Sequence, residues 1–163
     1  MTYKMVKKLS LQRVIPAVAA LLLLAGVCYM LWPHSLAALQ PECDSITIIR
    51  TDTAEDYSYT TTKETYSADS PAFAQIMDIL SRYTYHRSFR TLAGAHWMEG
   101  NHAGYWLDVY LDYGDARVDF TCGGTGEILI IDVVWRVGYW GDRAELAMMA
   151  ELAAVLEGQE TSE

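Results

Sequence analysis

"YWLDVYLDYGDARVDFTC", Tyr105 to Cys122, alternates apolar and polar residues on both sides of a short turn. Leu107, Val109 and Leu111 are each separated by one more polar residue, which is the period of a half-buried β-strand. Gly114-Asp115 fits a two-residue hairpin turn with glycine in its first position. The segment therefore predicts an antiparallel β-hairpin.

The turn also sets the register of this hairpin. It places Asp112 opposite Arg117, and it places Leu107 beside Cys122 on the apolar face. Because side chains alternate between the two faces of a strand, a slip of one residue would bury charged groups. We therefore expect a firm register in which Cys122 points toward the core.

Two strands and a helix are predicted on the N-terminal side of the hairpin. Ser45–Thr51 is short and β-branched, and Asp56–Tyr66 is rich in threonine and aromatic residues, so both favour strands. Pro71 is a favoured first residue of a helix, and apolar residues at helical spacing follow it until the pattern fades near Tyr85. Residues 90–105 contain three glycines, which predicts a loop.

A strand and a helix are predicted on the C-terminal side. The turn CGGTG at 122–126 leads into Glu127–Val137, whose two apolar faces are typical of one central strand. A phosphate-binding loop would need a helix after its glycines, whereas a strand is predicted here, so we expect a hairpin turn. Asp142 suits the N-cap of the last helix, with Glu145 three residues later, and Gly158 suits its C-cap.

Together these elements predict an α+β fold. An N-terminal transmembrane helix is followed by strand, strand, helix, three strands and helix, so a small antiparallel sheet of about five strands would pack against two helices. The predicted boundaries are 1–13 for a basic cytoplasmic segment, 14–32 for the anchor, 33–42 for a linker, 43–158 for the α+β domain and 159–163 for a tail.

The N-terminal segment is the predicted membrane anchor. Val14–Trp32 contains 19 residues without a formal charge. A helix of this length covers about 28 Å, close to the roughly 30 Å hydrocarbon core of a bilayer. Lys4, Lys7, Lys8 and Arg13 precede it with no acidic residue among them. Positively charged flanks stay in the cytoplasm, so we expect the C-terminal domain to be extracellular.

Three outcomes are open for this segment. Its apolar run is longer than a signal peptide needs, which favours an uncleaved single-pass anchor in the cell membrane. Cleavage after Ala37 would instead give a secreted protein. Lipid attachment at Cys28 is the third outcome, although Val27 is bulkier than the usual lipoprotein signal has before its cysteine. All three outcomes place the domain outside the cytoplasm.

The formal charges are divided between the anchor and the domain. All 21 acidic residues but only eight of the 12 Lys and Arg residues follow Trp32, so this part carries a charge of −13. Such a domain is expected to be soluble and repelled by nucleic acid and by anionic lipid headgroups. We therefore expect no nucleic-acid partner.

His96, Glu99 and His102 are residues of metal-binding types within the segment HWMEGNH. Their spacing differs from His-Glu-x-x-His, which places two histidines one helical turn apart on one face. A metal-dependent hydrolase that uses these three residues is therefore an alternative hypothesis. Solvated polar residues of a loop are the simpler interpretation, and we expect no cofactor.

Two cysteines follow the anchor, at Cys43 and Cys122. A disulfide between them is chemically allowed outside the cytoplasm. The alternative is a pair of separate thiols, one of them buried as a small apolar side chain.

Aromatic residues suggest a binding surface. Trp106 and Tyr110 share the polar face of the predicted hairpin, and with Trp97 they could form a platform for a glycan, a peptide or a partner protein. The alternative is that the loop at 90–105 or a helix covers this platform.

The layout of a basic start, a single span and a short domain of strands and helices resembles the uncharacterised membrane-anchored proteins of Gram-positive bacteria, grouped as domains of unknown function. This resemblance implies a location and carries no active residues. We expect a membrane-anchored extracytoplasmic binding module without catalysis, whose partner is a cell-wall polymer, a peptide or another membrane protein. A structural subunit of a membrane complex is a further alternative.

Overall fold

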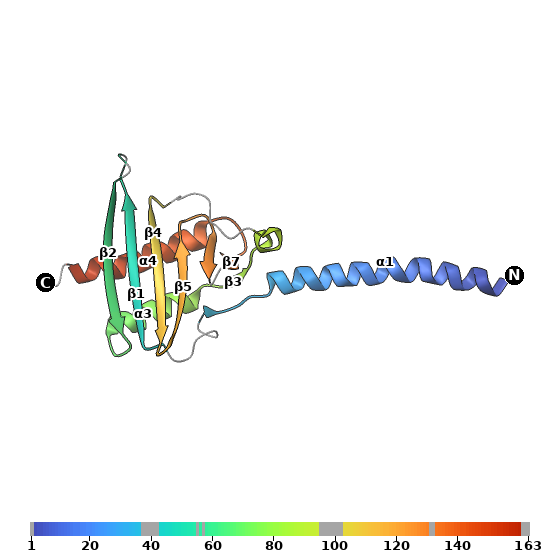
Figure 1. Cartoon of the computed structure of the whole chain (residues 1–163), viewed down its shortest axis with the longest axis horizontal. Coiled ribbons are helices and arrows are strands. Elements are labelled where there is room, and N and C mark those ends of the chain that lie inside the picture. The colour runs from blue at the N-terminus through green and yellow to red at the C-terminus, as the bar shows by residue number, and fades with distance from the viewer. Residues whose placement is uncertain are drawn as a thin grey trace. The chain divides into compact units, whose positions relative to one another are not determined.

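The structure is a computed structural model that describes residues 2–36, 43–54, 56, 58–94, 103–130 and 133–160. The chain divides into two compact units, Met1–Trp32 and Pro33–Glu163. The first unit consists of helix α1, and the second contains a β-sheet with helices α3 and α4 (Figure 1).

Helix α1 confirms the apolar N-terminal helix that the sequence predicts. It runs from Thr2 to Leu31, and its part Val14–Leu31 has a mean hydropathy of 2.5. This part is long and apolar enough to cross a membrane, and a signal sequence would have the same property.

The second unit is built on one antiparallel sheet with the strand order β2-β1-β4-β5-β6-β7-β3 (Figure 1). Its strands are β1 (Ser45–Thr53), β2 (Tyr59–Ser67), β3 (Tyr85–Arg87), β4 (Tyr105–Tyr113), β5 (Ala116–Cys122), β6 (Glu127–Ile130) and β7 (Val133–Val137). The α+β class is therefore confirmed, but the described residues form seven strands where the sequence predicts five.

The β4–β5 hairpin has the predicted register. Asp112 lies opposite Arg117, and Leu107 lies opposite Cys122. Gly114 has a φ of 55°, a left-handed conformation that glycine adopts without a steric penalty, which explains its position in the turn. β1 pairs with β4 on one side and with β2 on the other, so the hairpin lies in the middle of the sheet.

The prediction of one strand over Glu127–Val137 is wrong. β6 and β7 are separate strands that pair antiparallel, because the chain reverses between Ile130 and Val133. Ile128 and Trp135 are therefore cross-strand neighbours, whereas a single strand would place them on opposite faces.

The short edge strand β3 is a second feature that the sequence does not predict, and it receives the N-terminal end of the folded unit. The backbone N–H of His34 donates to the carbonyl of Tyr85 at 2.7 Å, and the N–H of Tyr85 donates to the carbonyl of His34 at 2.9 Å. Leu36 is only 3% exposed and belongs to the core. The folded unit thus begins inside the segment 33–42 that the sequence assigns to a linker.

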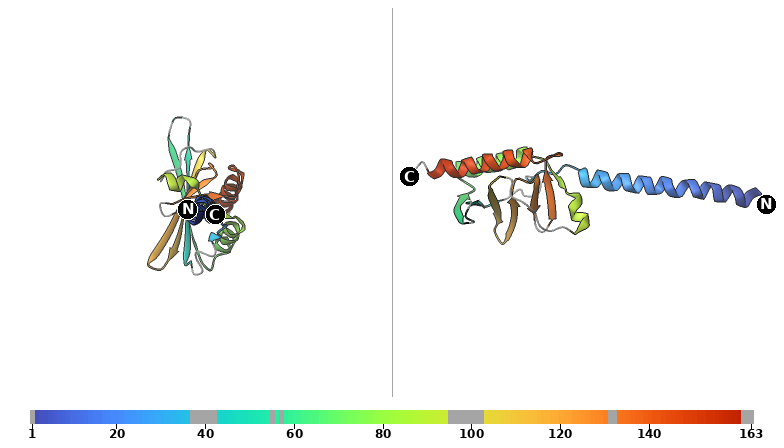
Figure 2. Two further views of the ribbon diagram at one scale, coloured as in Figure 1. Left: turned by 90° about the vertical axis from the view of Figure 1, so that its right-hand side faces the viewer. Right: turned by 90° about the horizontal axis from the view of Figure 1, so that it is seen from above.

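Helices α3 (Pro71–Arg82) and α4 (Arg143–Glu160) cover the same face of the sheet (Figure 2). α3 begins at Pro71 as predicted, and the Ser70 hydroxyl caps it by accepting from the N–H of Phe73 at 3.2 Å. α4 continues through Gly158 to Glu160, so the prediction that Gly158 ends this helix is wrong.

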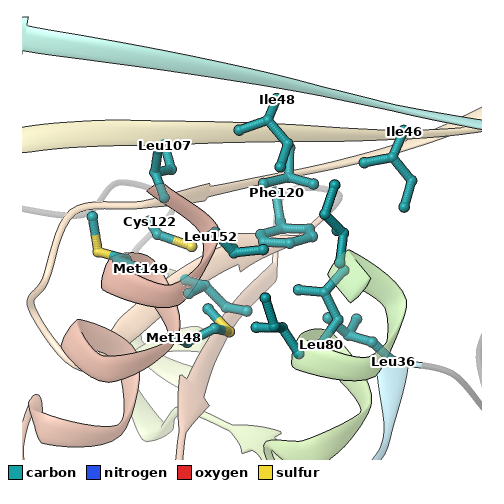
Figure 3. Close-up of a cluster of buried hydrophobic side chains, with 14 of the residues drawn as sticks. Leu36, Ile46, Ile48, Leu80, Leu107, Phe120, Cys122, Met148, Met149 and Leu152 are labelled. Carbon is teal, nitrogen blue, oxygen red and sulfur yellow. The ribbon is translucent and has the colours of Figure 1, made fainter. Parts of the chain in front are cut away.

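Buried side chains from the sheet and both helices form one core (Figure 3). Its members include Ile46, Ile48, Leu107, Phe120 and Cys122 from the strands, and Leu80, Met148, Met149 and Leu152 from the helices. The hydroxyl of Tyr85 donates to the carbonyl of Leu80 at 3.0 Å and lies 3.3 Å from the sulfur of Met148. These contacts join β3 to α3 and α4. In the described part of the folded unit, neither α3 nor α4 lies on the opposite face of the sheet.

Candidate ligand-binding face

We name the face of the sheet turned away from α3 and α4 the outer face. Because side chains alternate along a strand, the neighbours of core residues point toward it. Trp106 and Tyr110 both lie there, as predicted, since Leu107 and Val109 are buried in the core. The outer-face residues of β1, β2, β4 and β5 include Thr47, Ile49, Thr51, Thr61, Lys63, Thr65, Trp106, Asp108, Tyr110, Asp112, Arg117, Asp119 and Thr121.

A hollow of about 230 Å³ lies on the outer face, and we name it the Tyr110 hollow. Its lining residues are Thr47, Ile49, Lys63, Tyr110 and Arg117. The sheet register brings them together, because Thr47 lies opposite Tyr110 on β4 and Ile49 lies opposite Lys63 on β2. The hollow therefore spans four strands and exists only in the assembled sheet.

Two cations border the Tyr110 hollow, and they differ in their partners. The Nε atom of Arg117 lies 2.6 Å from a carboxylate oxygen of Asp112, and the Arg117 guanidinium lies 5.3 Å from the centre of the Tyr110 ring. The hydrogen bond to Asp112 raises the pKa of Arg117. By contrast, the ammonium of Lys63 has no hydrogen bond or ion pair with any described residue. Lys63 is also the one lysine that follows Lys8 in the sequence.

Hydroxyl groups and an aromatic ring complete the lining. The hydroxyl oxygens of Thr47 and Thr65 are hydrogen-bonded at 2.9 Å. Burial raises the pKa of Tyr110, and the carboxylates of Asp108 and Asp119 raise it further, so its hydroxyl stays protonated and can donate a hydrogen bond. The hollow thus offers cations, hydroxyls and a ring face to one small chemical group.

Trp106 is less available than the sequence suggests. A Cβ added to Gly123 would lie only 2.6 Å from the Trp106 ring, so the ring packs closely on the backbone of the β5–β6 turn. Trp97, the third residue of the predicted platform, lies outside the described residues. Tyr110 is therefore the member of this set that lines the hollow.

A second polar site is buried where the β5–β6 turn meets α4. The carboxylate of Glu145 is fully buried and accepts backbone hydrogen bonds from Gly123 at 2.9 Å, from Gly124 at 3.0 Å and from Gly126. Successive backbone N–H groups of this kind form an anion-binding concavity. The turn joins the antiparallel strands β5 and β6, as predicted, and its N–H groups are occupied by the protein's own Glu145 carboxyl group.

Opposing effects act on the pKa of Glu145. Burial raises it, the three glycine N–H groups lower it, and the neighbouring charge of Asp142 raises it, with a net increase. The sequence suggests a helix-capping role for Glu145, because it follows Asp142 by three residues. Its contact with the glycine turn depends on how α4 packs on the sheet, which local sequence does not reveal.

A third polar cluster surrounds Glu127 near the β3 edge. Glu127 is 5% exposed and accepts hydrogen bonds from the Ser88 hydroxyl at 2.7 Å and from Arg90 at 2.9 Å. Arg90 belongs to the 3₁₀ helix η1 (Phe89–Ala93). Arg136 lies 3.5 Å from the same carboxylate. These partners satisfy the charge of Glu127, so the cluster fastens η1 to the sheet.

The predicted metal ligands His96, Glu99 and His102 lie outside the described residues. Within the described part of the chain, no group of three or more His, Cys, Asp or Glu side chains is arranged to hold a metal. The hydrolase hypothesis therefore stays a prediction. Metal analysis of the purified full chain and of its His96→Ala variant tests it, because a metal held by these residues would be lost in the variant.

The predicted disulfide is not formed, because Cys43 and Cys122 are free thiols. Cys122 lies opposite Leu107, whereas Ser45, two residues after Cys43, lies opposite Asp112. The five residues between these β4 positions span about 16 Å, far more than the roughly 4–7 Å between Cα atoms that a disulfide allows. Burial raises the pKa of Cys122 well above its usual value, so this thiol is a poor nucleophile.

Comparison with protein-family models, with curated proteins and with solved structures finds no match for this chain.

Proposed function

We propose that this protein is a membrane-anchored binding module whose outer face takes a ligand with an anionic group. The observation that carries this proposal is the Tyr110 hollow, where the ammonium of Lys63, which has no partner among the described residues, lies beside Arg117 and an aromatic ring. A charge-assisted hydrogen bond between an ammonium and a carboxylate or phosphate is shorter and stronger than a neutral one. The hollow is therefore suited to one such group.

The remaining lining indicates what would lie beside the anionic group. Tyr110 presents a ring that can pack against a sugar or an apolar side chain, and Thr47 presents a hydroxyl. Cell-wall polymers and acidic peptides both combine anionic groups with such surfaces. Asp108, Asp112 and Asp119 lie on the same face and offset part of the attraction that Lys63 and Arg117 exert on an anion. The hollow is therefore suited to a single anionic group and disfavours a second one nearby.

The proposed location is the outer surface of the cell membrane, with α1 retained as an anchor. His34 and Leu36 support retention, because cleavage after Ala37 would remove both residues from the folded unit. The basic residues before Val14 support an extracellular domain. A reporter enzyme that works only outside the cytoplasm, fused after Glu163, should be active, and activity of a cytoplasm-dependent reporter would contradict this orientation.

In-cell photo-crosslinking tests the proposed binding face. A photoreactive amino acid placed at Thr65, which is exposed beside Thr47 on the outer face, should capture the ligand. The matched control places the same amino acid at Ser81, which is exposed on α3 over the other face of the sheet. Adducts from both positions alike, or from neither, would contradict a ligand site on the outer face.

The chemical identity of the adduct also separates this proposal from its alternatives. Mass spectrometry of a polymer or peptide adduct at position 65 supports the binding module. A single protein captured in stoichiometric amount from both positions would instead indicate a structural subunit of a membrane complex.

A further inference from the structure

The β3 edge of the folded unit exposes aromatic side chains. Phe89, Tyr139 and Trp140 are 51%, 44% and 90% exposed, and the other large apolar residue exposed in the described part of this unit is Tyr59. Exposing a whole tryptophan ring to water forgoes a large gain from burial. Such a residue indicates a surface that contacts something else.

These aromatic residues lie along the same edge of the sheet. The ring of Tyr139 stacks on His86 of β3 with 5.1 Å between ring centres. The N–H of Ser88, the residue before Phe89, donates to the carbonyl of Val134 in β7 at 3.0 Å. Figure 1 shows β3, β7 and η1 together at one edge of the sheet. We name the surface formed by Phe89, Tyr139, Trp140 and their flanking arginines the aromatic edge.

Cations are concentrated at the aromatic edge. Four of the eight Lys and Arg residues that follow the anchor lie in or beside β3, η1, β7 and the start of α4, namely Arg87, Arg90, Arg136 and Arg143. The nearby carboxylate of Glu127 is buried between Arg90 and Arg136. The other described carboxylates there are Asp142 and Glu145, and Glu145 is buried like Glu127. The four arginines therefore leave a small excess of positive charge at this edge of a domain whose formal charge is −13.

The chain enters the folded unit at this same edge. His34 bridges Tyr85 of β3, and its ring lies edge-on against Trp135 with 5.1 Å between ring centres. Only Pro33 separates His34 from Trp32, the last residue of the predicted span. At about 3.5 Å per residue, this tether reaches no further than about 7 Å.

We propose that the aromatic edge docks on the phospholipid headgroup layer of the membrane that α1 enters. Tryptophan and tyrosine are the residues that favour this layer, because their rings are apolar and their polar atoms stay in water. Arginine pairs with phosphate oxygens through two parallel hydrogen bonds, and phospholipids present such phosphates. This inference rests on the anchoring role proposed for α1 and is independent of the ligand of the Tyr110 hollow.

Fluorescence quenching by brominated lipids tests the docking on the full-length protein in phospholipid vesicles. Bromine atoms on the acyl chains, close to the headgroups, quench only those tryptophans that reach them. The wild-type emission minus that of Trp140→Phe gives the contribution of Trp140. The same difference for Trp32→Phe gives the contribution of Trp32, at the end of the predicted span. We expect the fluorescence of both Trp140 and Trp32 to fall by at least half in brominated vesicles, compared with vesicles of ordinary lipid.

The remaining quenching results distinguish failure of the docking from failure of the anchor. Quenching of Trp32 without quenching of Trp140 would leave the anchor in place and overturn the docking. Quenching of neither would overturn both the anchor and the docking. The variant Lys63→Ala leaves the aromatic edge intact, so its Trp140 component should be quenched as in the wild type. Arg143→Ala removes an exposed arginine of the aromatic edge that lies outside the Glu127 cluster. It should reduce that quenching, and an unchanged value would exclude a role for the phosphates.

Discussion

Glu145 is the residue on which the packing of α4 depends most directly. Its buried carboxylate accepts from three backbone N–H groups of the β5–β6 turn, so it holds the helix and the sheet together through one side chain. Removing a buried acceptor leaves its donors unsatisfied, which costs more than the hydrogen bonds themselves contribute. The glycines of this turn are consequently structural, and their N–H groups are already occupied.

Glu145→Ala should destabilise the folded unit by about 3 kcal/mol, because buried N–H groups lose their partner. Urea unfolding of residues 33–163 measures this change. Glu157→Ala is the matched control on the same helix, since its side chain is 65% exposed, and it should cost less than about 1 kcal/mol. Equal losses in the two variants would show that the Glu145 contacts contribute nothing specific.

The raised pKa of Glu145 predicts a pH dependence of stability. The folded state holds this proton more tightly than the unfolded state, whose carboxyl has its ordinary value of 4.5. As the pH rises from 4.5 through the raised folded pKa, ionisation therefore makes this group progressively less favourable to folding. Glu145→Gln removes this titration. The free energy of unfolding of the wild type minus that of the variant should therefore fall as the pH rises through this range, and then level off. A difference that rises with pH would contradict the burial argument.

At the level of single elements, the segment before β1 is more important than its sequence suggests. His34 adds two backbone hydrogen bonds to β3, and Leu36 is buried in the core. We expect residues 38–163 to be less stable to urea than residues 33–163 by about 2 kcal/mol or more, from the burial of Leu36 alone. Equal stability of the two fragments would remove the structural argument against cleavage after Ala37.

The elements that the sequence predicts well are those fixed by local chemistry. The β4–β5 hairpin follows from Gly114-Asp115 and strict alternation, and the start of α3 follows from Ser70 and Pro71. The segment Glu127–Val137 contains no glycine or proline, and both of its faces are apolar. No pattern in the sequence therefore marks the point where it divides into two strands. β3 has only three residues, which is too short for any periodicity to be seen, and it forms by pairing with β7.

The same contrast applies to the candidate site. Alternation along one strand is enough to place Trp106 and Tyr110 on a common face. The Tyr110 hollow also needs Lys63 and Ile49, which reach it only because β2 and β1 pair beside β4 in the sheet. That neighbourhood is a long-range property of the strand order. The position of Lys63 in the hollow therefore gives no signal in the sequence.

In the molecule as a whole, the two proposed surfaces lie on different parts of the sheet. The aromatic edge surrounds β3, which is the last strand at one side, whereas the Tyr110 hollow extends over β4, β5 and β1 to β2, the last strand at the other side. Docking of one edge on lipid would leave the hollow accessible. The negative net charge of the whole domain is compatible with a positively charged aromatic edge, because charges act mainly within about 10 Å in salt.

The charge of Lys63 gives the most direct test of ligand binding on the outer face. The yield of the adduct from position 65 should fall about tenfold in Lys63→Ala, because a charge-assisted hydrogen bond contributes about 1.5–3 kcal/mol. Lys63→Arg keeps the charge and should retain most of the yield. An unchanged yield in Lys63→Ala, with the folded unit intact, would contradict an anionic ligand in the Tyr110 hollow.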